Sequence, residues 1–352
     1  MTSHHRGACQ LVAPVLWLAI AAACSDRAAE SVTVRVGIAN ASSDVGLFIA
    51  HKKGYFKAEG LNVSFVSFDS GARMVAPLGA GQLDVGAGSP SAGLYNAVVR
   101  GIPIKIVADK GSTPKGYGYQ PLLVRKDLVD SGRYKTYADL KGMKLAVGTF
   151  GSANASAMNE ALKKGGLKWS DAASIVALVF PQHIIAYQNK AIDASMTNEP
   201  TSTTAVQTGL AVRIAGNDEI YPAQQTAVVL YSEIFARQKP QIAHKFMRAY
   251  VKAVRDYNDA LRDGRIAGPN ADEVIATLVE HTFIKDPAIY RSITPAAIDP
   301  DGRMNMDGLR NDLQFFKEQK LLQDPAITVE RIIDTSFVEK AVQELGPYRP
   351  RN

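Results

Sequence analysis

The stretch Gly79–Gly101, GAGQLDVGAGSPSAGLYNAVVRG, decides the fold class. Val85–Ala87 is a short apolar strand, and the small residues after it lead into a helix. Ser89 or Ser91 can cap this helix and Pro90 suits its first turn, so its first backbone N–H groups face whatever lies above the strand. Such a helix start carries partial positive charge and favours anionic or hydrogen-bond-accepting groups. Taken alone, the stretch fits any βα junction.

Composition indicates a globular protein with room for two lobes. The chain has 352 residues, of which 46% are hydrophobic and 21% are charged. Its formal charge of +6 is spread thinly, without the Lys/Arg blocks or interleaved aromatics that nucleic-acid binding requires. This pattern argues against nucleic acid as a partner.

The first residues differ from the rest and predict a signal peptide over 1–23. Arg6 supplies a basic start, Leu11–Ala22 an apolar segment and Ala21–Ala23 a small-residue cleavage site. The apolar segment is too short to span a bilayer, which needs about 20 residues. We therefore expect export to the periplasm or cell envelope.

Cysteine usage bears on how the exported chain is held. The chain has two cysteines, Cys9 and Cys24, and cleavage after residue 23 leaves Cys24 as the first residue. Ala21–Cys24 resembles a bacterial lipobox, in which that cysteine is lipidated, although the usual larger aliphatic residue is missing. Two outcomes stay open: a lipid anchor at Cys24, or a soluble periplasmic product. Residues 24–31 are a short tether in either case.

Beyond the tether, strands alternate with helices and predict parallel sheets in an α/β fold. The first series ends near residue 108, and a loop is expected from Lys110 to Tyr119. A second series follows, and helices dominate after Ser232. We expect lobe 1 over 32–120 plus 227–352, with the C-terminal helices, and lobe 2 over 121–226. Each lobe should hold a mainly parallel sheet flanked by helices.

Four strand ends meet helix starts, two in each expected lobe. In open α/β sheets, ligands bind outside the carboxyl ends of the strands. If the lobes face each other, these junctions line one cleft and offer backbone N–H groups and small hydroxyls to a small polar or anionic molecule. The four junctions are Ala41–Asp44, Ser89–Ser91, Thr149–Ser152 and Thr197–Thr201.

Segments spread over both lobes resemble the substrate-binding proteins of ABC importers. The branch they resemble serves nitrate, sulfonates, taurine and thiamin-pyrimidine precursors. The resemblance implies a two-lobed periplasmic-binding-protein fold of type II that closes by hinge motion on a small organic solute, anionic or nitrogenous. It also implies a monomer without a cofactor, with a membrane permease and its ATPase as partners. The segments are 47–50, 53–63, 81–86, 101–104, 139–147, 191–194 and Glu199-Pro200.

Carried over by position, the resemblance implies ligand contacts at both sets of junctions. The four junctions contain no Lys, Arg or His, and the nearest basic residues, Arg73 and Lys110, are expected on the surface. Phe150 and Tyr117 could stack on a ligand ring or serve as wall packing. His183 is expected to be a cap or a surface residue. The implied contacts are Ser42, Ser43, Ser89, Ser91, Gly151, Ser152, Asn198 and Glu199.

Glu199 leaves two interpretations open. An unpaired carboxylate in a dry cleft is costly, which argues against a simple inorganic anion as the ligand. The side chain would suit a ligand with an N–H or ammonium donor. It would equally suit a cap on the helix after Pro200.

Other functional classes are less well supported by the residues. A periplasmic sensor subunit would use the same binding chemistry with a signalling partner. Two enzymes share the architecture, a pyrimidine-forming enzyme of thiamin synthesis and a chorismate-type dehydratase, but both are cytosolic. Beyond residue 23, the sequence lacks a His-x-x-His or Cys-x-x-Cys pair, a G-x-S-x-G elbow and a P-loop. We therefore expect a binding protein rather than an enzyme.

Overall fold

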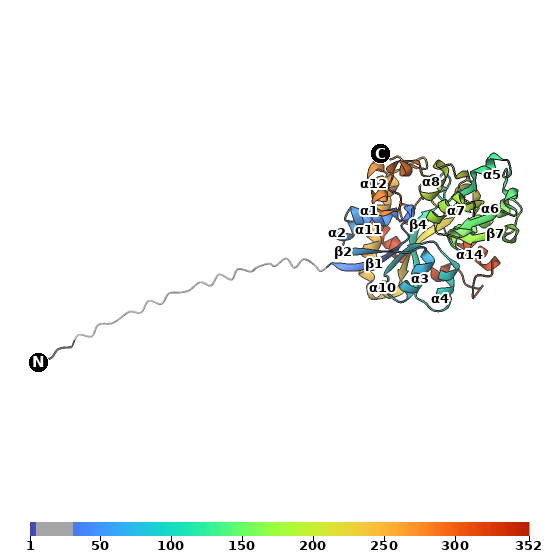
Figure 1. Cartoon of the computed structure of the whole chain (residues 1–352). Coiled ribbons are helices and arrows are strands. Elements are labelled where there is room, and N and C mark those ends of the chain that lie inside the picture. The colour runs from blue at the N-terminus through green and yellow to red at the C-terminus, as the bar shows by residue number, and fades with distance from the viewer. Residues whose placement is uncertain (5–30, 352) are drawn as a thin grey trace. The chain divides into compact units, whose positions relative to one another are not determined.

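The computed structural model describes residues 1–4 and 31–351 (Figure 1). The predicted cleavage site after residue 23, Cys24 and the tether up to residue 30 lie outside these residues. Within the part of the chain that the structure describes, every helix is too short or too polar to span a bilayer.

The strand of the Gly79–Gly101 stretch lies at the centre of a five-stranded sheet, in the order β2-β1-β3-β10-β4. Its strands are β1 (Val32–Ile38), β2 (Leu61–Ser67), β3 (Val85–Gly88), β4 (Ile104–Ser112) and β10 (Gln225–Ser232). Its helical segments are η1 (Ser42–Asp44), α1 (Val45–Lys52), α2 (Tyr55–Ala58), α3 (Gly71–Gly79) and α4 (Ala92–Val99). We call this sheet with its helices lobe 1.

A second five-stranded sheet, in the order β7-β6-β8-β5-β9, forms lobe 2. Its strands are β5 (Leu122–Arg125), β6 (Lys144–Val147), β7 (Ser174–Ala177), β8 (Ala194–Met196) and β9 (Ala211–Ala215). Its helical segments are α5 (Lys126–Asp130), η2 (Tyr137–Leu140), α6 (Ala153–Lys164), η3 (Trp169–Asp171), α7 (Phe180–Gln188), α8 (Thr201–Gln207) and α9 (Asn217–Ile220).

Both sheets are mainly parallel, with a single antiparallel strand each. β10 is antiparallel to β3 and β4, and β5 is antiparallel to β8 and β9. β5 is the first strand after the chain passes from lobe 1 to lobe 2, and β10 is the first strand after it returns to lobe 1. Each of these two strands therefore runs opposite to the other strands of its sheet. The predicted two-lobed α/β fold class is confirmed. The lobe boundaries at 120/121 and 226/227 stay a prediction, since residues 31–352 form one compact unit.

The start of the predicted loop at Lys110 is wrong, because β4 continues to Ser112. Lys110-Gly111-Ser112 has a loop-like composition, which hides a strand in the sequence. In the structure this segment pairs with the beginning of β10, Gln225 to Ser112 and Ala227 to Gly111. Strand pairing over more than 100 residues of sequence therefore overrides local composition, and it carries Lys110 into the interior.

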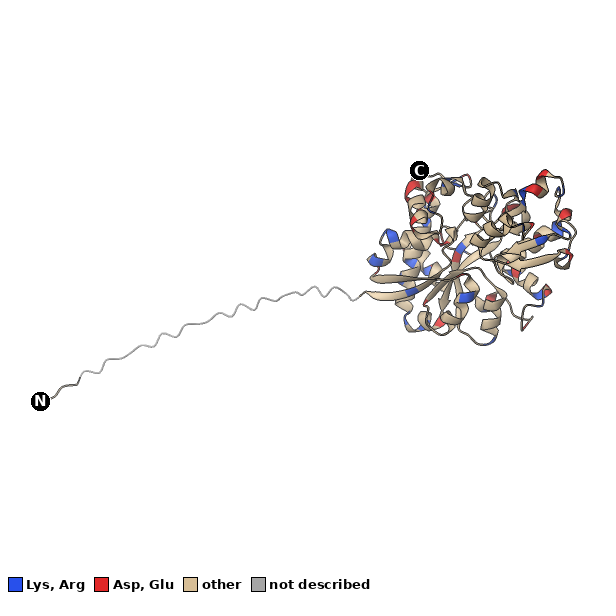
Figure 2. Cartoon of the chain, viewed as in Figure 1, with Lys and Arg blue, Asp and Glu red and all other residues tan. Residues whose placement is uncertain are grey.

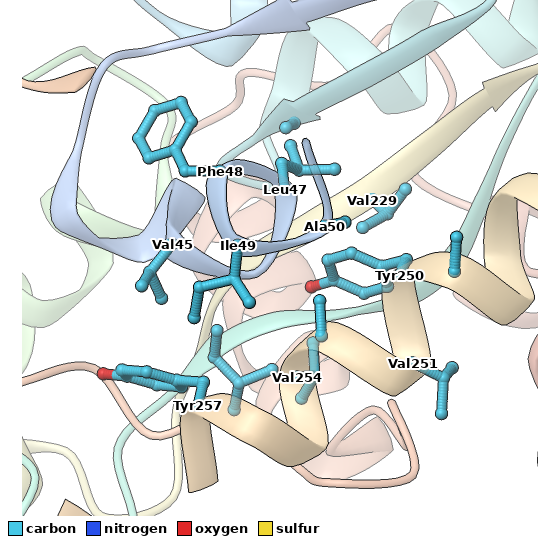
Figure 3. Packing of buried hydrophobic residues seen from close by; sticks show 14 of the residues in the cluster. Val45, Leu47, Phe48, Ile49, Ala50, Val229, Tyr250, Val251, Val254 and Tyr257 are labelled. Carbon is cyan, nitrogen blue, oxygen red and sulfur yellow. The ribbon is translucent and has the colours of Figure 1, made fainter. Parts of the chain in front are cut away.

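The C-terminal region supplies most of the remaining helices. They are α10 (Glu233–Gln238), α11 (Pro240–Asp259), α12 (Ala271–His281), α13 (Pro287–Ser292), α14 (Met306–Glu318) and α15 (Ser336–Leu345), with η4 (Glu330–Ile332) and a small hairpin of β11 (Leu261–Arg262) and β12 (Arg265–Ile266). Helix α11 packs against α1 and α15. Tyr250, Val254 and Tyr257 of α11 face Val45 and Ile49 of α1 (Figure 3) and are at most 3% exposed. The aromatic side chains of α11 are thus part of the core.

Helix α14 contacts both lobes. It packs against α6 of lobe 2 and β10 of lobe 1. The Phe315 ring lies 5.8 Å from Trp169 of lobe 2, and the Phe316 ring lies 6.1 Å from Tyr95 of lobe 1. The hydrophobic core beneath α14 is therefore shared between the lobes.

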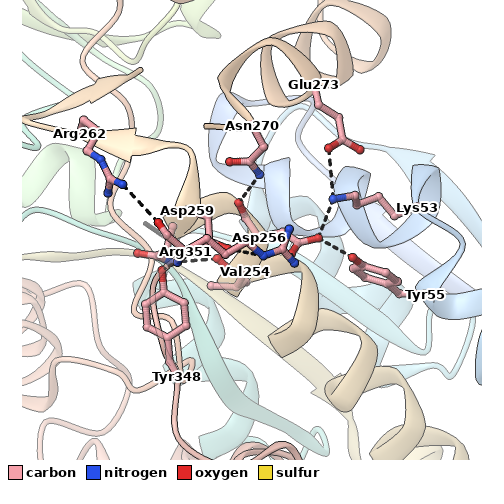
Figure 4. A network of polar contacts seen from close by, with 11 residues as sticks. Lys53, Tyr55, Val254, Asp256, Asp259, Arg262, Asn270, Glu273, Tyr348 and Arg351 are labelled. Carbon is pink, nitrogen blue, oxygen red and sulfur yellow. Dashed lines mark hydrogen bonds and ion pairs between the residues drawn. The ribbon is translucent and has the colours of Figure 1, made fainter. Parts of the chain in front are cut away.

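The chain end is held on α11 by two buried carboxylates (Figure 4). Asp256 pairs with Arg351 at 2.9 Å and with Lys53 at 2.8 Å, and it accepts a hydrogen bond from Tyr55. Asp259 accepts from the Tyr348 hydroxyl at 2.9 Å and from the Arg351 backbone N–H at 3.0 Å. These contacts join the last residues to lobe 1.

We expect Asp259→Ala to loosen the chain end and lower the free energy of unfolding by about 1–3 kcal/mol. The substitution removes the acceptor for two donors and an ion-pair partner of Arg351. Urea unfolding and limited proteolysis with mass spectrometry measure both effects. Asp272→Ala is the control, because Asp272 is 84% exposed in its pair with Arg291 and should change stability by less than about 0.5 kcal/mol. Equal behaviour of the two variants would contradict the assignment.

Charged residues are distributed evenly over the described body. Basic and acidic segments are interspersed on both lobes in the view of Figure 2. This distribution agrees with a surface charged for solubility rather than one built for nucleic acid.

Candidate functional site

A cavity of about 100 Å³ lies between the two lobes, at the carboxyl ends of both sheets. All four predicted strand–helix junctions contribute to it, together with the start of α3 and the two crossings between the lobes. Its lining comprises Ala39, Ala41, Ser43, Asp69–Ala72, Gly88, Ser89, Ser91, Lys110, Tyr119, Gln120, Gly148, Thr149, Ser152, Asn154, Val179, Phe180, Asn198, Thr226 and Ala227. At roughly 10–15 Å³ per water molecule, the cavity has room for a small solute.

Of the nine candidate ligand residues, which are the eight implied contacts and Phe150, five line this cavity: Ser43, Ser89, Ser91, Ser152 and Asn198. Their convergence follows from the topology, since the junctions of both sheets face one another.

The other four predicted residues lie beside the cavity. The Ser42 hydroxyl donates to the Glu199 carbonyl at 3.1 Å, and the Gly151 carbonyl accepts from the Ala92 N–H at 2.9 Å. The Phe150 side chain is 52% exposed. A ligand role for these residues stays a prediction.

The geometry of Glu199 matches the capping interpretation. One carboxylate oxygen accepts from the Thr203 backbone N–H at 3.0 Å, within the first turn of α8, and the other lies 3.4 Å from Arg213. The residue is 2% exposed, and burial raises the pKa of its carboxyl. Both oxygens are thus engaged within lobe 2.

Lys110 is the main cavity residue that the sequence analysis missed, and its expected surface position is wrong. It is 1% exposed and lines the cavity from β4. Its ammonium donates to the Ser43 hydroxyl at 3.0 Å and lies 2.8 Å from Asp44, which is fully buried. An ammonium has three N–H donors. One donates to Ser43 and Asp44 lies within ion-pair distance, which leaves at least one N–H for an acceptor in the cavity.

Asn198 presents an unused polar group to the same space. The residue is 8% exposed, and its Oδ1 atom has no hydrogen-bond partner among the described residues. A buried amide without a partner is costly in a closed protein. A bound molecule would supply the missing partner, and the amide can turn either its oxygen or its nitrogen toward it.

Helix α3 points its first turn at the cavity. Its N-cap residue, Ser70, makes no side-chain capping bond within the described part of the chain, unlike Ser91 of α4 and Ser152 of α6. The start of α3 lies directly against the end of β3. Glycine at positions 71 and 88 makes this close contact possible, since a Cβ on Gly88 would lie 2.4 Å from the Gly71 Cα. The first N–H groups of α3 are therefore available to a ligand.

Three further residues can be compared with their expected positions. His183 is fully buried rather than on the surface, bonded to Thr197 at 2.8 Å and to the Leu178 carbonyl at 3.1 Å. Burial lowers the pKa of its imidazole to about 4. Tyr117 packs against the lobe 1 core, and Arg73 is exposed as expected.

A family model described as NMT1-like matches residues 27–267, which is more than half of the chain and includes all four junctions. The chain belongs to the NMT1-like family. This membership confirms the predicted resemblance to the periplasmic substrate-binding proteins of ABC importers.

Individual relatives agree with this assignment. A protein of Brachyspira hyodysenteriae that carries the name of an ABC transporter periplasmic binding protein is 27% identical over 80% of this chain and 82% of its own. The alkanesulfonate-binding protein SsuA from Xanthomonas axonopodis, solved with MOPS, superposes with a TM-score of 0.70 at 18% identity, covering 88% of this chain and 100% of its own.

The fold of this NMT1-like protein also serves catalysis in another protein. The desulfurization enzyme DSZB superposes with a TM-score of 0.58 at 16% identity, covering 90% of this chain and 100% of its own. Fold therefore does not decide between binding and catalysis, and the site has to. Among residues 1–4 and 31–351, no three His, Cys, Asp or Glu side chains are grouped so that they could hold a metal ion.

The lobes of the NMT1-like protein touch across the cavity through their junctions. The Ala153 N–H donates to Ser89 Oγ at 3.3 Å, and the bonds from Ala92 to Gly151 and from Ser42 to Glu199 also join one lobe to the other. The structure therefore represents a closed arrangement, in which the junctions hold one another.

Ser42→Ala is expected to shift the unliganded protein toward an open arrangement. It deletes one hydrogen bond between the lobes, worth about 0.5–1.5 kcal/mol, or roughly two- to tenfold in the closed-to-open ratio. Small-angle scattering of the unliganded protein should show a larger radius of gyration. Ser131→Ala is the control, because its hydroxyl bonds to Asp127 within lobe 2. An unchanged radius in Ser42→Ala would show that this contact does not hold the lobes together.

Proposed function

We propose that the protein is the solute-binding component of an ABC importer and that it binds a small organic anion between its lobes. The observation that carries the proposal is Lys110, buried in the inter-lobe cavity with at least one N–H donor left after Ser43 and Asp44. A buried donor of this strength favours an acceptor that carries negative charge.

Other donors in the cavity support the same ligand class. The start of α3 contributes backbone N–H groups and the positive end of a helix dipole. The hydroxyls of Ser43 and Ser91 each accept one bond, from Lys110 and from the Leu94 N–H, and keep their own O–H to donate to the ligand. A carboxylate or sulfonate group accepts several such bonds at once.

The acidic residues near the cavity give little support to a cationic ligand. Asp44 pairs with Lys110, and Glu199 is engaged by Thr203 and Arg213. Asp69 lines the cavity from an exposed position, where solvent reduces the effect of its charge. A ligand that offers only ammonium or N–H donors, such as a polyamine, would leave the buried Lys110 donor without an acceptor.

Closure of the two lobes links the binding of the ligand to its delivery to the membrane permease. Cavity residues come from both lobes, so the full set of contacts exists only when the lobes meet, and the ligand raises the closed population. A membrane permease with its ATPase would then receive the closed form. Export by the leader over 1–23, with or without a lipid anchor at Cys24, would place the protein in the periplasm or cell envelope as a monomer.

A thermal-shift screen of the purified protein tests the proposal. The panel contains aliphatic sulfonates, aromatic carboxylates, nitrate, bicarbonate, pyrimidines and polyamines. A ligand at about 100 times its dissociation constant stabilises by about 2.7 kcal/mol, which raises the midpoint by several degrees. We expect the largest shifts among the organic anions. Stabilisation by pyrimidines or polyamines alone would contradict the anion assignment.

A further inference from the structure

A second cavity, of about 310 Å³, adjoins the first and is larger than it. Four residues border both cavities: Ala39, Ala41, Phe180 and Asn198. The side chains on the lobe 1 side of this shared border are methyl groups, so little material separates the two spaces there. We call the first space the inner cavity and the second the outer cavity.

The outer cavity is more apolar than the inner one. Helix α7 of lobe 2 contributes Phe180, Pro181, Ile184 and Ile185, and the segment after α12 contributes Phe283 and Ile284. Both lobes therefore build it, as they build the inner cavity. Its polar lining includes Glu199, whose carboxylate is engaged by Thr203 and Arg213.

Two large apolar side chains at this cavity are left open to solvent. Ile185 is 58% exposed and Phe283 is 67% exposed, one on each lobe. Single exposed apolar side chains are ordinary, but two that line one cavity across a closing interface indicate an apolar occupant. The four shared residues place that cavity directly beside the anion site.

We propose that the outer cavity receives a hydrocarbon group of the ligand, so that the transported solute is an organic anion with an apolar substituent of about ring size. This inference rests on the proposed function. The charged head lies in the inner cavity against Lys110, and the substituent passes between Ala41 and Phe180 to lie against Ile185 and Phe283. Asn198 borders both spaces and contacts the ligand where head and substituent join.

The sizes of the two cavities and the burial of apolar surface support placing the head group in the inner cavity and the substituent in the outer one. The inner cavity is about 100 Å³, which suits a head group, whereas the outer cavity is about three times as large. Burial of a side chain the size of Phe contributes enough to tighten binding by roughly tenfold to a hundredfold. An inorganic anion would fill the inner cavity and leave the outer one without an occupant.

Isothermal titration of the purified protein with matched probes tests the inference. The probes are acetate and methanesulfonate as heads alone, and 3-phenylpropanoate and hexanoate as heads with a ring or a chain. We expect 3-phenylpropanoate to bind about tenfold to a hundredfold more tightly than acetate. Hexanoate distinguishes the kind of substituent, because a gain equal to that of the ring probe identifies a flexible chain as an equally good occupant.

The double substitution Ile185→Ser with Phe283→Ser tests whether the outer cavity is the source of the tighter binding of 3-phenylpropanoate. Both side chains are largely exposed, so the fold should tolerate the change. The preference for 3-phenylpropanoate over acetate should fall at least threefold. Val66→Ser, an exposed apolar residue on β2 outside both cavities, is the control and should keep the full preference.

The outcomes separate this inference from the proposed function. Equal binding of acetate and 3-phenylpropanoate by the unaltered protein would overturn the inference and leave the anion assignment standing. A preference that survives the double substitution unchanged would also overturn it. If no organic anion binds, whatever its substituent, then the proposed function fails and the inference fails with it.

Discussion

Replacing Lys110 with glutamine is expected to weaken the binding of organic anions about tenfold to a hundredfold. The substitution removes a charged donor from a water-excluded cavity, and hydrogen bonds to charged groups contribute about 1.5–3 kcal/mol. Glutamine can still donate from a neutral amide, so some affinity should remain. Isothermal titration with the anion that gives the largest thermal shift measures the loss.

The same substitution should also destabilise the fold, because it leaves Asp44 without its partner. Asp44 is fully buried, and its second oxygen accepts the backbone N–H groups of Ala39 and Ala41 at 3.2 and 2.9 Å. Breaking a buried pair at one side costs about 3–5 kcal/mol. Urea unfolding should show a loss of this size.

A double variant separates binding from stability. Lys110→Gln with Asp44→Asn removes both charges and keeps an acceptor for the two backbone N–H groups. We expect it to recover much of the stability without recovering anion affinity. Lys53→Gln is the matched control: Lys53 also pairs with a buried carboxylate, Asp256, but lies outside the inner cavity. It should lower stability and leave affinity unchanged. Full anion affinity in the double variant would show that Lys110 does not contact the ligand.

The second large effect is a loss of stability as the pH rises. Asp312 of α14 is 1% exposed, and burial raises the pKa of its carboxyl to about 7. Its Oδ1 accepts from Gln224 at 3.0 Å, whereas Oδ2 has no partner within the described residues. Burial also raises the pKa of Asp109 to about 7, with a smaller contribution from Asp299 in the same direction.

The sign follows from comparing the two states. An exposed aspartate has a pKa of about 3.9. Between about pH 4 and pH 7 the unfolded chain has lost the Asp312 proton while the folded protein keeps it, so folding becomes less favourable as the pH rises. Asp312 alone should lower the free energy of unfolding by up to about 4 kcal/mol across this window, with no further loss above it.

Asp312→Asn should reduce this dependence by about half, because Asp109 still contributes its share. The variant should match the unaltered protein near pH 4 and exceed its stability by several kcal/mol at pH 8, measured by urea unfolding at each pH. Asp109→Asn is the comparison: both Asp109 oxygens accept N–H groups, from Gly111 and Asp299, and an amide nitrogen cannot. It should lose stability near pH 4, and this loss should shrink as the pH rises toward 8, because the variant also removes the cost of ionising Asp109. An Asp312→Asn profile parallel to that of the unaltered protein would exclude Asp312 as the source.

Much of the fold followed from local sequence. The strand predicted at Val85–Ala87 is β3, Val85–Gly88, and the helix predicted after it is α4 with Ser91 as its cap, because apolar patterning and helix capping act over a few residues. Ser43, Ser89, Ser91 and Ser152, from three of the junctions, could be predicted to lie near one another because the carboxyl ends of parallel strands lie at the same edge of a sheet.

The tertiary structure alone decided the charged side of the site. Lys110 has no local signal of burial; it is drawn inside by pairing with β10, more than 100 residues later, and it is neutralised by Asp44 from another strand end. The outer cavity needs α7 and the segment after α12, which close on each other only when the lobes meet. Local sequence therefore determined which elements form and which hydroxyls line the cleft. Long-range packing determined the buried ammonium and the apolar space beside it, because both depend on contacts between segments that no short window of sequence contains.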